Sequence, residues 1–564
     1  MILIKHFLHI IAFLMIVQLM YAQSEYSSDN VTKIVYQQFH NGQARENQNP
    51  IWVYADAQYA YMTTRDQWNR TALYPAEMTF VEHHPGHYTL FTSLNEHDII
   101  ATKDTTSIEL QSFEFSDETK EILGYTCKKA KTSINSNTIE LWYTNELNIK
   151  GSPTILGQGL GLVLEYIRNG NFSIQAVALE KKTIQLPGFI ANEQYRLLDK
   201  INYQDEVWRS RFTTIPLFDR QQIHFSDTYE ARENTLRFAN GTIVVKKVTF
   251  PVLNANHQLF LDLTEQSNGD AYDRTGTVFL IPQDKATSFL DGLNDGANTL
   301  PIYENGNGKK YQGVIATDDY NPAVELMRFF TPFGVKHFNE RLTLKGLTWQ
   351  DSAFYRQEIT QYASLLSGQE VYIGVFIGNY DKGGHIVSAH VTIHNHEDTD
   401  VPLRHVLPLF NTLNIMEMAG QEYGTMFDHE DGLTMDFTLE RPMKNAQLIY
   451  TTTGHGGWNE GDEFVPKKNT IILNGKTVFD LTPWRSDCGS YRQYNPVSGN
   501  FSNGLSSSDY SRSNWCPGTI TNPYIIDLGD LQAGKHHIQV IIPQGAPAGS
   551  SFSAWNVSGV IVGE

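Results

Sequence analysis

Short runs in which hydrophobic and polar residues alternate recur along most of the chain. Between about 24 and 235 they include HYTLF, SIELQSFEF, TIELWYT and SIQAVALEKKTIQL. The pattern restarts at 236 in GTIVVKKVTFPV and QLFLDLT, and again near 397 in LTMDFTLE and KHHIQVIIP. A period of two places successive side chains on opposite faces of a β-strand. The sequence therefore predicts an all-β protein.

The turns between these runs predict how the strands are joined. ILNGKTVF places Asn-Gly between strand residues, which predicts a tight hairpin. QDSAFYRQEITQYASLLSG is the one helix-compatible stretch, and it also fits a strand followed by a turn. Short strands at regular spacing are typical of sandwiches and jelly rolls. Because 564 residues exceed what one core supports, the restarts predict domains at 23–235, 236–396 and 397–564.

The first 22 residues have the pattern of a secretory signal peptide. Lys5 precedes an apolar run that ends in Tyr21-Ala22, a small-residue cleavage pattern. A membrane anchor is the alternative, because the apolar run is near the minimum that spans a bilayer. We expect a signal peptide over 1–22 and a secreted or periplasmic protein with no membrane partner.

The charge of the chain narrows the classes of ligand. The formal net charge is −19, and no dense run of lysine and arginine occurs. A surface that binds nucleic acid needs such a basic patch to neutralise phosphates. Nucleic acid is therefore excluded as a partner, whereas a neutral ligand such as a glycan is compatible.

Three cysteines are too few for a disulfide scaffold, and their spacing fits no metal site. Cys488 and Cys516 flank a loop rich in Gly, Ser and Asn, and export permits a bridge that would close it. The alternative is two free thiols. Cys127 is left over and is predicted to be buried.

Charged and aromatic residues gather at the ends of predicted strands. Asp273 and Arg274 lie where GDAYDRTG enters the strand TVFLIP, and Arg512 lies in the loop that the expected bridge would close. The Gly-rich segment GHGGWNEGDEF, which lets a ligand approach the backbone, offers two acids and two flat side chains: Asp462, Glu463, His455 and Trp458. Two carboxylates and an arginine suffice for amide or glycoside hydrolysis. Solvated surface charges, a calcium loop and a core tryptophan are the alternatives.

Two segments resemble known families. EILGYTCKKAKT, TIELWYT and GSPTILGQGLGLVLEY are similar to exported bacterial proteins named for a Gly-Leu-Pro-Gly-Leu-Ile signature, although the proline is missing here. AYDRTGTVFL, FTPFGV, EITQYASLLSG, YTTTGHGGWNEGDEF and SRSNWCPG resemble the peptide:N-glycosidase F family over about 240–564. This second resemblance implies two tandem eight-stranded antiparallel jelly rolls after the accessory β domain, with the site in the cleft between them.

The resemblance to peptide:N-glycosidase F also implies residue roles. Asp273 matches an essential aspartate, with Tyr272 in place of a tryptophan and Arg274 retained. Glu463 matches a second essential acid, expected where a strand opens. Arg512 matches an arginine that contacts substrate, and Cys488–Cys516 matches the family's bridge.

The chain departs from the family at two positions. A third functional glutamate would fall near Ile377, which is no carboxylate. Asp381 could substitute only if its loop curls back. His455 stands where the family keeps a tryptophan, so the aromatic wall differs.

The implied activity is hydrolysis of the amide that links asparagine to the first N-acetylglucosamine of a glycoprotein or glycopeptide. Asp273 and Glu463 would be catalytic, and Tyr272, Arg274, Arg512, Trp458, His455, Asp462 and Asp381 would contact substrate. No cofactor and no metal are expected, and the protein is expected to be a bacterial monomer. A secreted endo-β-N-acetylglucosaminidase and a non-catalytic glycan-binding protein are the alternatives.

Overall fold

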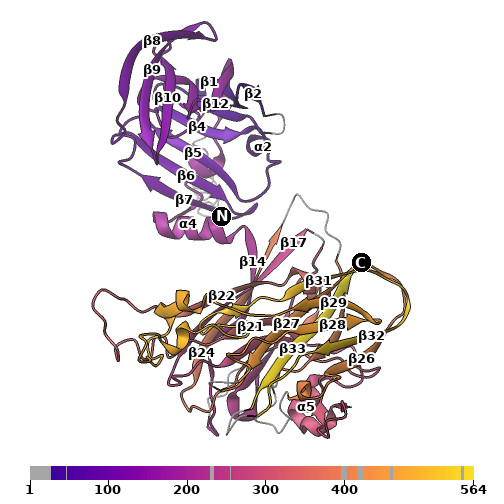
Figure 1. Ribbon diagram of the computed structural model, residues 1–564. Helices are drawn as coiled ribbons and strands as arrows, with labels where there is room; N and C mark the ends of the chain where they lie inside the picture. Colours follow the sequence, from indigo (N-terminus) through magenta and orange to yellow (C-terminus); the bar gives the residue numbers. More distant parts are fainter. Residues whose placement is uncertain are drawn as a thin grey trace, which may run out of the picture. The chain divides into compact units, whose positions relative to one another are not determined.

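In the computed structural model the described residues are 27–45, 48–228, 234–254, 256–395, 403–413, 415, 425–457, 461–547 and 552–564. The described residues up to Arg211 form one compact unit, and those from Phe212 to Glu564 form another. Strands dominate each unit (Figure 1), which confirms the all-β prediction. The expected signal peptide lies outside the described residues. Within the described part, no helix is long and apolar enough to cross a membrane.

The first unit is built on one large, mostly antiparallel sheet. Its spatial order is β13-β7-β6-β5-β4-β3-β1-β12-β11-β10-β9-β8, with β2 paired to β1. The strands are β1 (Ser27–His40), β2 (Gln43–Ala44), β3 (Ile51–Ala55), β4 (Tyr59–Thr64), β5 (Ala76–Glu82), β6 (His87–Ser93), β7 (Ile99–Asp104), β8 (Glu114–Ile122), β9 (Tyr125–Ile134), β10 (Asn137–Thr144), β11 (Leu162–Arg168), β12 (Phe172–Gln185) and β13 (Arg196–Leu197). The helices are α2 (Arg65–Trp68), α3 (Gly188–Ala191) and α4 (Lys200–Arg209). Tyr203 and Val207 of α4 pack in one cluster with Ile100 of β7, which ties the helix to the sheet.

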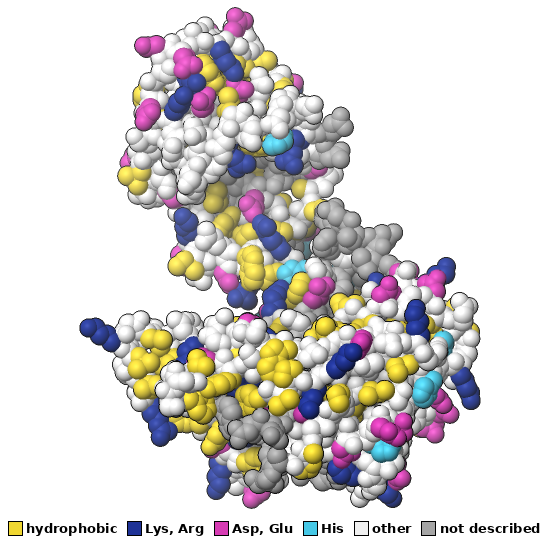
Figure 2. Space-filling view, viewed as in Figure 1, with side chains coloured by type: hydrophobic (Ala, Val, Ile, Leu, Met, Phe, Trp, Pro, Cys, Tyr) yellow, Lys and Arg dark blue, Asp and Glu magenta, His cyan; other side chains and the backbone are white. Residues whose placement is uncertain are grey.

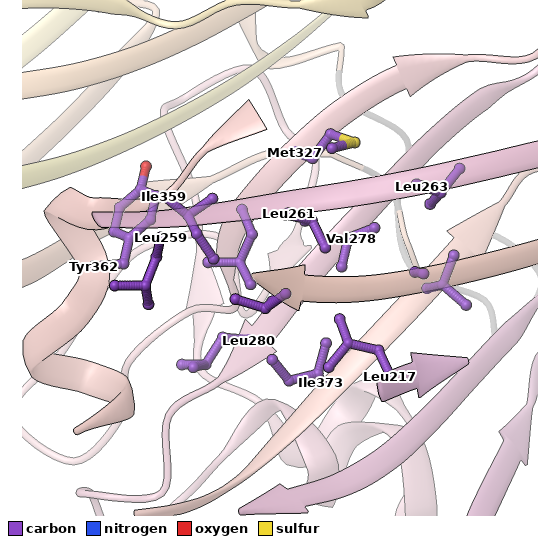
Figure 3. Packing of buried hydrophobic residues seen from close by; sticks show 14 of the residues in the cluster. Leu217, Leu259, Leu261, Leu263, Val278, Leu280, Met327, Ile359, Tyr362 and Ile373 are labelled. Atoms are coloured by element: carbon purple, nitrogen blue, oxygen red, sulfur yellow. The ribbon is translucent and has the colours of Figure 1, made fainter. Parts of the chain in front are cut away.

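The second unit begins with a pair of facing sheets. One sheet has the order β14-β24-β17-β22 and the other β15-β16-β23-β18-β21-β30. Their strands are β14 (Phe212–Ile223), β15 (Thr235–Phe238), β16 (Ile243–Thr249), β17 (His257–Ser267), β18 (Thr275–Ile281), β21 (Val324–Phe330), β22 (Ala353–Glu358), β23 (Glu370–Ile377), β24 (His385–Asn395) and β30 (Ile520–Thr521). Apolar side chains from both sheets meet in one buried cluster, including Leu261, Leu263, Val278 and Ile373 (Figure 3). The two sheets therefore form a sandwich.

A second sandwich follows in the same unit. Its sheets have the orders β25-β33-β27-β31 and β26-β32-β28-β29. A small β19-β20 pair forms a sheet of its own, and its Tyr303 and Tyr311 belong to the buried cluster of this sandwich. The strands are β19 (Ile302–Tyr303), β20 (Tyr311–Gln312), β25 (His405–Asn411), β26 (Leu433–Leu439), β27 (Met443–His455), β28 (Asn469–Leu473), β29 (Lys476–Leu481), β31 (Tyr524–Leu531), β32 (Gly534–Ile541) and β33 (Ala554–Gly563). The helices of the unit are short: α5 (Phe289–Asp295), α6 (Ala363–Leu366), η1 (Ala239–Gly241), η2 (Ala297–Thr299), η3 (Thr360–Tyr362), η5 (Met426–Asp428), η6 (Cys488–Tyr494) and η7 (Ser507–Asp509).

Three local expectations can be compared with this architecture. Asn474 and Gly475 have φ values of 51° and 80° between β28 and β29, as a tight Asn-Gly hairpin turn requires. The helix-compatible stretch forms β22 followed by η3 and α6. The sequence predicts an accessory domain over 23–235, whereas the compact units divide after Arg211. Strand β14 groups with the second unit because it pairs along β24, from Phe212 opposite His394 to Ile223 opposite His385.

Charged side chains of both signs are mixed on the visible surface. On the face shown in Figure 2, lysine and arginine side chains are scattered among acidic ones.

A disulfide closes the long loop between β29 and β30. Cys488 and Cys516, 28 positions apart, are bonded and fully buried, and Cys127 is a free, buried thiol. Both predictions are confirmed. Arg512 lies inside this closed loop, so the bridge limits the freedom of a candidate site residue.

Removing the disulfide is expected to lower the free energy of unfolding by about 2–4 kcal/mol, because the unfolded chain gains loop entropy. The change is the double replacement Cys488→Ser with Cys516→Ser, measured by urea unfolding. Cys127→Ala is the control, and a reductant should destabilise it as much as it destabilises the wild type. Equal stability of the double variant and the wild type would show that the bridge contributes nothing.

Candidate active site

A buried arginine joins two acids that are far apart in the sequence. Arg512 Nε donates to Glu463 Oε1 at 2.9 Å, and Arg512 Nη2 lies 3.3 Å from Asp273 Oδ2. The arginine side chain is 1% exposed, whereas the side chains of Asp273 and Glu463 are 16% and 19% exposed. The cation is therefore inside the protein and both carboxylates reach solvent.

Each of the three residues is held by a different element. Asp273 lies two positions before β18, and its neighbour Arg274 is tied to Thr331, which follows β21: Arg274 N donates to Thr331 Oγ1 at 2.7 Å. Glu463 lies in a turn between β27 and β28 and does not open a strand, which departs from the expected position. Its carbonyl accepts from the amide of Ser513 at 2.9 Å, so the Glu463 turn and the Arg512 loop are bonded directly.

Arg512 itself is fixed on several sides. Its Nη1 donates to the carbonyls of Ser507 at 2.9 Å and Tyr510 at 3.2 Å. The guanidinium lies 4.7 Å from the ring centroid of Trp515 and 5.1 Å from that of Phe464. Such stacking suits the flat guanidinium and leaves its edge free to bind carboxylates. The arginine is therefore positioned before any substrate arrives.

The two acids bind protons more tightly than ordinary carboxylic acids. Burial is the largest influence and raises the pKa of Asp273 and of Glu463, while Arg512 opposes it in both. The negative charge of Asp273 further raises the pKa of Glu463. Two carboxylates whose pKa values rise toward neutral pH can exchange roles as proton acceptor and proton donor.

Tyr272 and Arg274 flank Asp273 and differ in exposure. Tyr272 is 62% exposed, whereas the Arg274 side chain is 24% exposed, and the Arg274 guanidinium lies 5.0 Å from the Tyr272 ring centroid. Arg274 Nε also donates to Asp270 Oδ2 at 2.7 Å. Tyr272 lines a groove of about 700 Å³ whose other walls come from both sandwiches, among them Phe333, Arg341, Val497 and Phe501.

The aromatic residues proposed from the Gly-rich segment have separate outcomes. Trp458 lies outside the described residues. His455 ends β27, and its ring stacks 5.7 Å from that of Trp515 and 5.9 Å from that of Phe330. Burial lowers the pKa of His455 to about 3, so the imidazole is neutral at neutral pH. His455 is thus part of an aromatic stack behind Arg512.

Asp462 is placed differently from its neighbour Glu463. The side chain is fully buried, and its Oδ2 accepts from Trp555 Nε1 at 2.7 Å and from the amide of Gly545 at 2.9 Å. Lys467 Nζ lies 3.6 Å from Oδ1. These contacts anchor the turn that carries Glu463 and leave the Asp462 carboxylate buried away from solvent, so the expected contact with substrate has no support in its geometry.

The loop after β23 contains Asp381, the acid expected to replace the third glutamate. Ile377 ends β23 fully buried in the core of the first sandwich. Asp381 Oδ1 accepts from the amides of Gly383 and Gly384 at 2.7 and 2.8 Å. A Cβ at Gly269 would lie 2.6 Å from the same oxygen, so the loop does bring Asp381 beside the segment that leads to Asp273. Its carboxylate stabilises this turn, and its role toward substrate stays a prediction.

Three buried titratable residues behind the site were missed by the sequence analysis. His385 Nδ1 lies 2.8 Å from Glu265 Oε1, and His385 Nε2 lies 3.5 Å from Asp270 Oδ2. Glu265 and His385 are fully buried, and Asp270 is nearly so. A signal existed for Glu265 alone, because it occupies an inward position of the alternating strand that also buries Leu259, Leu261 and Leu263.

The protonation of His385 predicts a pH dependence of stability. Burial alone would lower the pKa of His385, but its contacts with Asp270 and Glu265 outweigh burial and raise the pKa from 6.5 to about 9. A folded-state pKa above the unfolded value stabilises the native state fully below pH 6.5, and this contribution is lost as the pH rises through 9. Thermal unfolding temperatures should fall over this window more steeply in the wild type than in His385→Gln. Parallel curves would contradict the assignment.

The arrangement places two carboxylates, which can accept and donate a proton, beside a fixed cation at a place that solvent can reach. A buried cation can stabilise negative charge that develops on a carbonyl oxygen. The described residues contain no group of three or more His, Cys, Asp or Glu placed to hold a metal ion.

Three family models match this chain. Residues 34–205 match an N-glycanase peptide, N-terminal domain, residues 214–393 match peptide-N-glycosidase F, N terminal, and residues 422–562 match peptide-N-glycosidase F, C terminal. A comparison with curated proteins found no match.

The chain is also similar to solved structures. A structure of PNGF-II is 51% identical, covers 95% of this chain and 99% of that chain, and has a TM-score of 0.90. A second crystal form of PNGF-II has a TM-score of 0.87 at the same identity, covering 95% of this chain and 98% of that chain. PNGase F, a glycosylasparaginase from Flavobacterium meningosepticum, is 17% identical with a TM-score of 0.42, covering 63% of this chain and 96% of that chain.

Proposed function

Because the chain belongs to the peptide-N-glycosidase F family, we propose that it hydrolyses the amide between an asparagine side chain and the first N-acetylglucosamine of an N-linked glycan. The observation that carries this proposal is the contact of one buried arginine, Arg512, with both Asp273 and Glu463. The substrate is a glycoprotein or a glycopeptide. Residues 1–22 would export the protein, so that it acts as a secreted or periplasmic monomer.

In the proposed mechanism, Asp273 takes a proton from a water molecule, which attacks the side-chain carbonyl carbon of asparagine. Glu463 holds this water, and Glu463 and Asp273 share one proton between their carboxylates. Arg512 is buried behind the two carboxylates, so it does not touch substrate; its positive charge holds both acids in place and favours the negative charge that develops beside them. The carbon–nitrogen bond then breaks as the proton taken from the water passes from the acid pair to the amide nitrogen, which leaves as a glycosylamine.

The products follow from this balance of bonds. The peptide retains an aspartate where the asparagine was, with one carboxylate oxygen derived from water. The glycan leaves intact as a glycosylamine, which then loses ammonia to water. Tyr272 and Arg274 lie beside Asp273 and would contact the core sugars or the peptide.

The proposal is tested on a glycopeptide incubated in water enriched with heavy oxygen. Mass spectrometry should find the intact glycan released and heavy oxygen in a new aspartate of the peptide. An endo-β-N-acetylglucosaminidase would instead leave one sugar on an unlabelled asparagine. A glycan-binding protein would retain the glycopeptide without releasing sugar. Either outcome would overturn the amidase proposal.

A further inference from the structure

Four charged residues form a network, here called the charge network, that runs from the core of the first sandwich to the loop of Asp273. The order is Glu265 on β17, His385 at the start of β24, Asp270 and Arg274. The contacts are 2.8 Å from Glu265 Oε1 to His385 Nδ1, 3.5 Å from His385 Nε2 to Asp270 Oδ2, and 2.7 Å from Asp270 Oδ2 to Arg274 Nε. Acidic and basic groups alternate, so each charge faces opposite charges.

Asp270 connects the charge network to both neighbours of Asp273. Its Oδ1 accepts from the amide of Tyr272 at 3.0 Å, and its carboxylate binds Arg274 through both Nε and Nη2. The carbonyl of Asp270 accepts from Ser267 Oγ at 2.5 Å, which ties the loop back to β17. The residues on either side of Asp273 are therefore held by one buried carboxylate.

The charge network is energetically costly for a purely structural contact. Glu265, His385 and Asp270 are in the protein interior, whereas the Arg274 side chain is 24% exposed. Placing an ionised group in the interior costs several kcal/mol before its attraction to its neighbours is counted. Apolar residues of similar volume would pack β17 against β24 without that cost. Glu265 and His385 are 0% exposed, so they cannot touch substrate. Any contribution they make to the reaction has to pass through Asp270.

We infer that Glu265, His385 and Asp270 are positioning residues, which fix the backbone of 270–274 and thereby the direction of the Asp273 carboxylate. This inference rests on the proposed amidase function. Water activation requires the carboxylate within hydrogen-bonding distance of the water and aligned with it. Loss of the charge network should therefore slow turnover and leave substrate binding largely in place.

The test compares His385→Gln with His390→Gln on a glycopeptide substrate. Both residues belong to β24, but the His390 side chain is 45% exposed and is not part of the charge network. His385→Gln should lower kcat by about 10- to 100-fold, because displacements near 1 Å cost rates of this order. KM should stay within about threefold of the wild type, since the change acts on the reacting group. His390→Gln should match the wild type in both constants.

Folding is monitored so that a loss of structure is not mistaken for misplacement. Near-ultraviolet circular dichroism at the assay temperature should coincide for all variants. Where His385→Gln fails to fold, Glu265→Gln replaces it, since a glutamine still accepts a hydrogen bond from the imidazole. A folded variant with wild-type kcat, or with a change confined to KM, would overturn the inference. A wild-type protein that releases no glycan would instead refute the proposed function.

Discussion

Replacing Asp273 by asparagine is expected to lower glycan release by about a thousandfold without loss of the fold. A positioned general base contributes on the order of 10² to 10⁴ in rate. Asparagine keeps the size of the side chain but cannot take a proton from water. The loop should also survive, since Tyr272 and Arg274 are held by Asp270 and Thr331 and not by Asp273.

The measurement is the rate of glycan release from a glycopeptide, with thermal unfolding recorded for each variant. Asp284→Asn is the matched control. The same aspartate-to-asparagine change is made there away from the site. Asp284 Oδ2 accepts from Asn321 Nδ2 at 2.9 Å, in the loop beyond the other end of β18. More than about one tenth of the wild-type rate in Asp273→Asn would remove Asp273 from the proposed role.

Replacing Arg328 by methionine is expected to destabilise the second unit by about 3–5 kcal/mol. Arg328 is fully buried on β21 and binds Glu325 at 2.8 Å. It also reaches the second sandwich, where Nη1 donates to the carbonyl of Asn556 at 2.7 Å and to Thr453 Oγ1 at 3.1 Å. Without the arginine, Glu325 would remain as a buried carboxylate without its cation.

Urea unfolding followed by tryptophan fluorescence measures this loss. Arg356→Met is the control, because the Arg356–Asp262 pair is on the surface, with side chains 49% and 21% exposed. Pairs of this kind contribute about 0–1 kcal/mol. Adding Glu325→Gln to Arg328→Met should recover part of the stability, since the stranded charge is gone. Equal costs for Arg328→Met and Arg356→Met would show that the interior pair does not join the sandwiches as described.

The fold could be predicted from local sequence because strand burial has a short period. In β17 the side chains of Leu259, Leu261 and Leu263 are buried and those between them are partly exposed, which is the alternation visible in QLFLDLT. The Asn474–Gly475 turn was also readable, since few other residues accept two successive positive φ values. The division at Arg211 was not, because β14 is assigned by its partner β24, which lies far along the chain.

The candidate site was less predictable than the fold. Asp462 and Glu463 are adjacent acids in one turn, yet one carboxylate is buried against Trp555 and the other contacts Arg512. Which way each side chain points depends on β33 and on the disulfide-closed loop, and the local sequence contains neither. Glu265 and His385 were missed because their pairing joins strands 120 positions apart.

The central claim is that Asp273 and Glu463 act together through Arg512. The most direct measurement is kcat/KM for Asp273→Asn, for Glu463→Gln and for the double variant, on one glycopeptide. Residues that act as one unit lose little more together than the worse single change. We predict that the double variant is within about tenfold of the slower single variant. If the two losses multiply instead, the acids act independently and the account of this site is wrong.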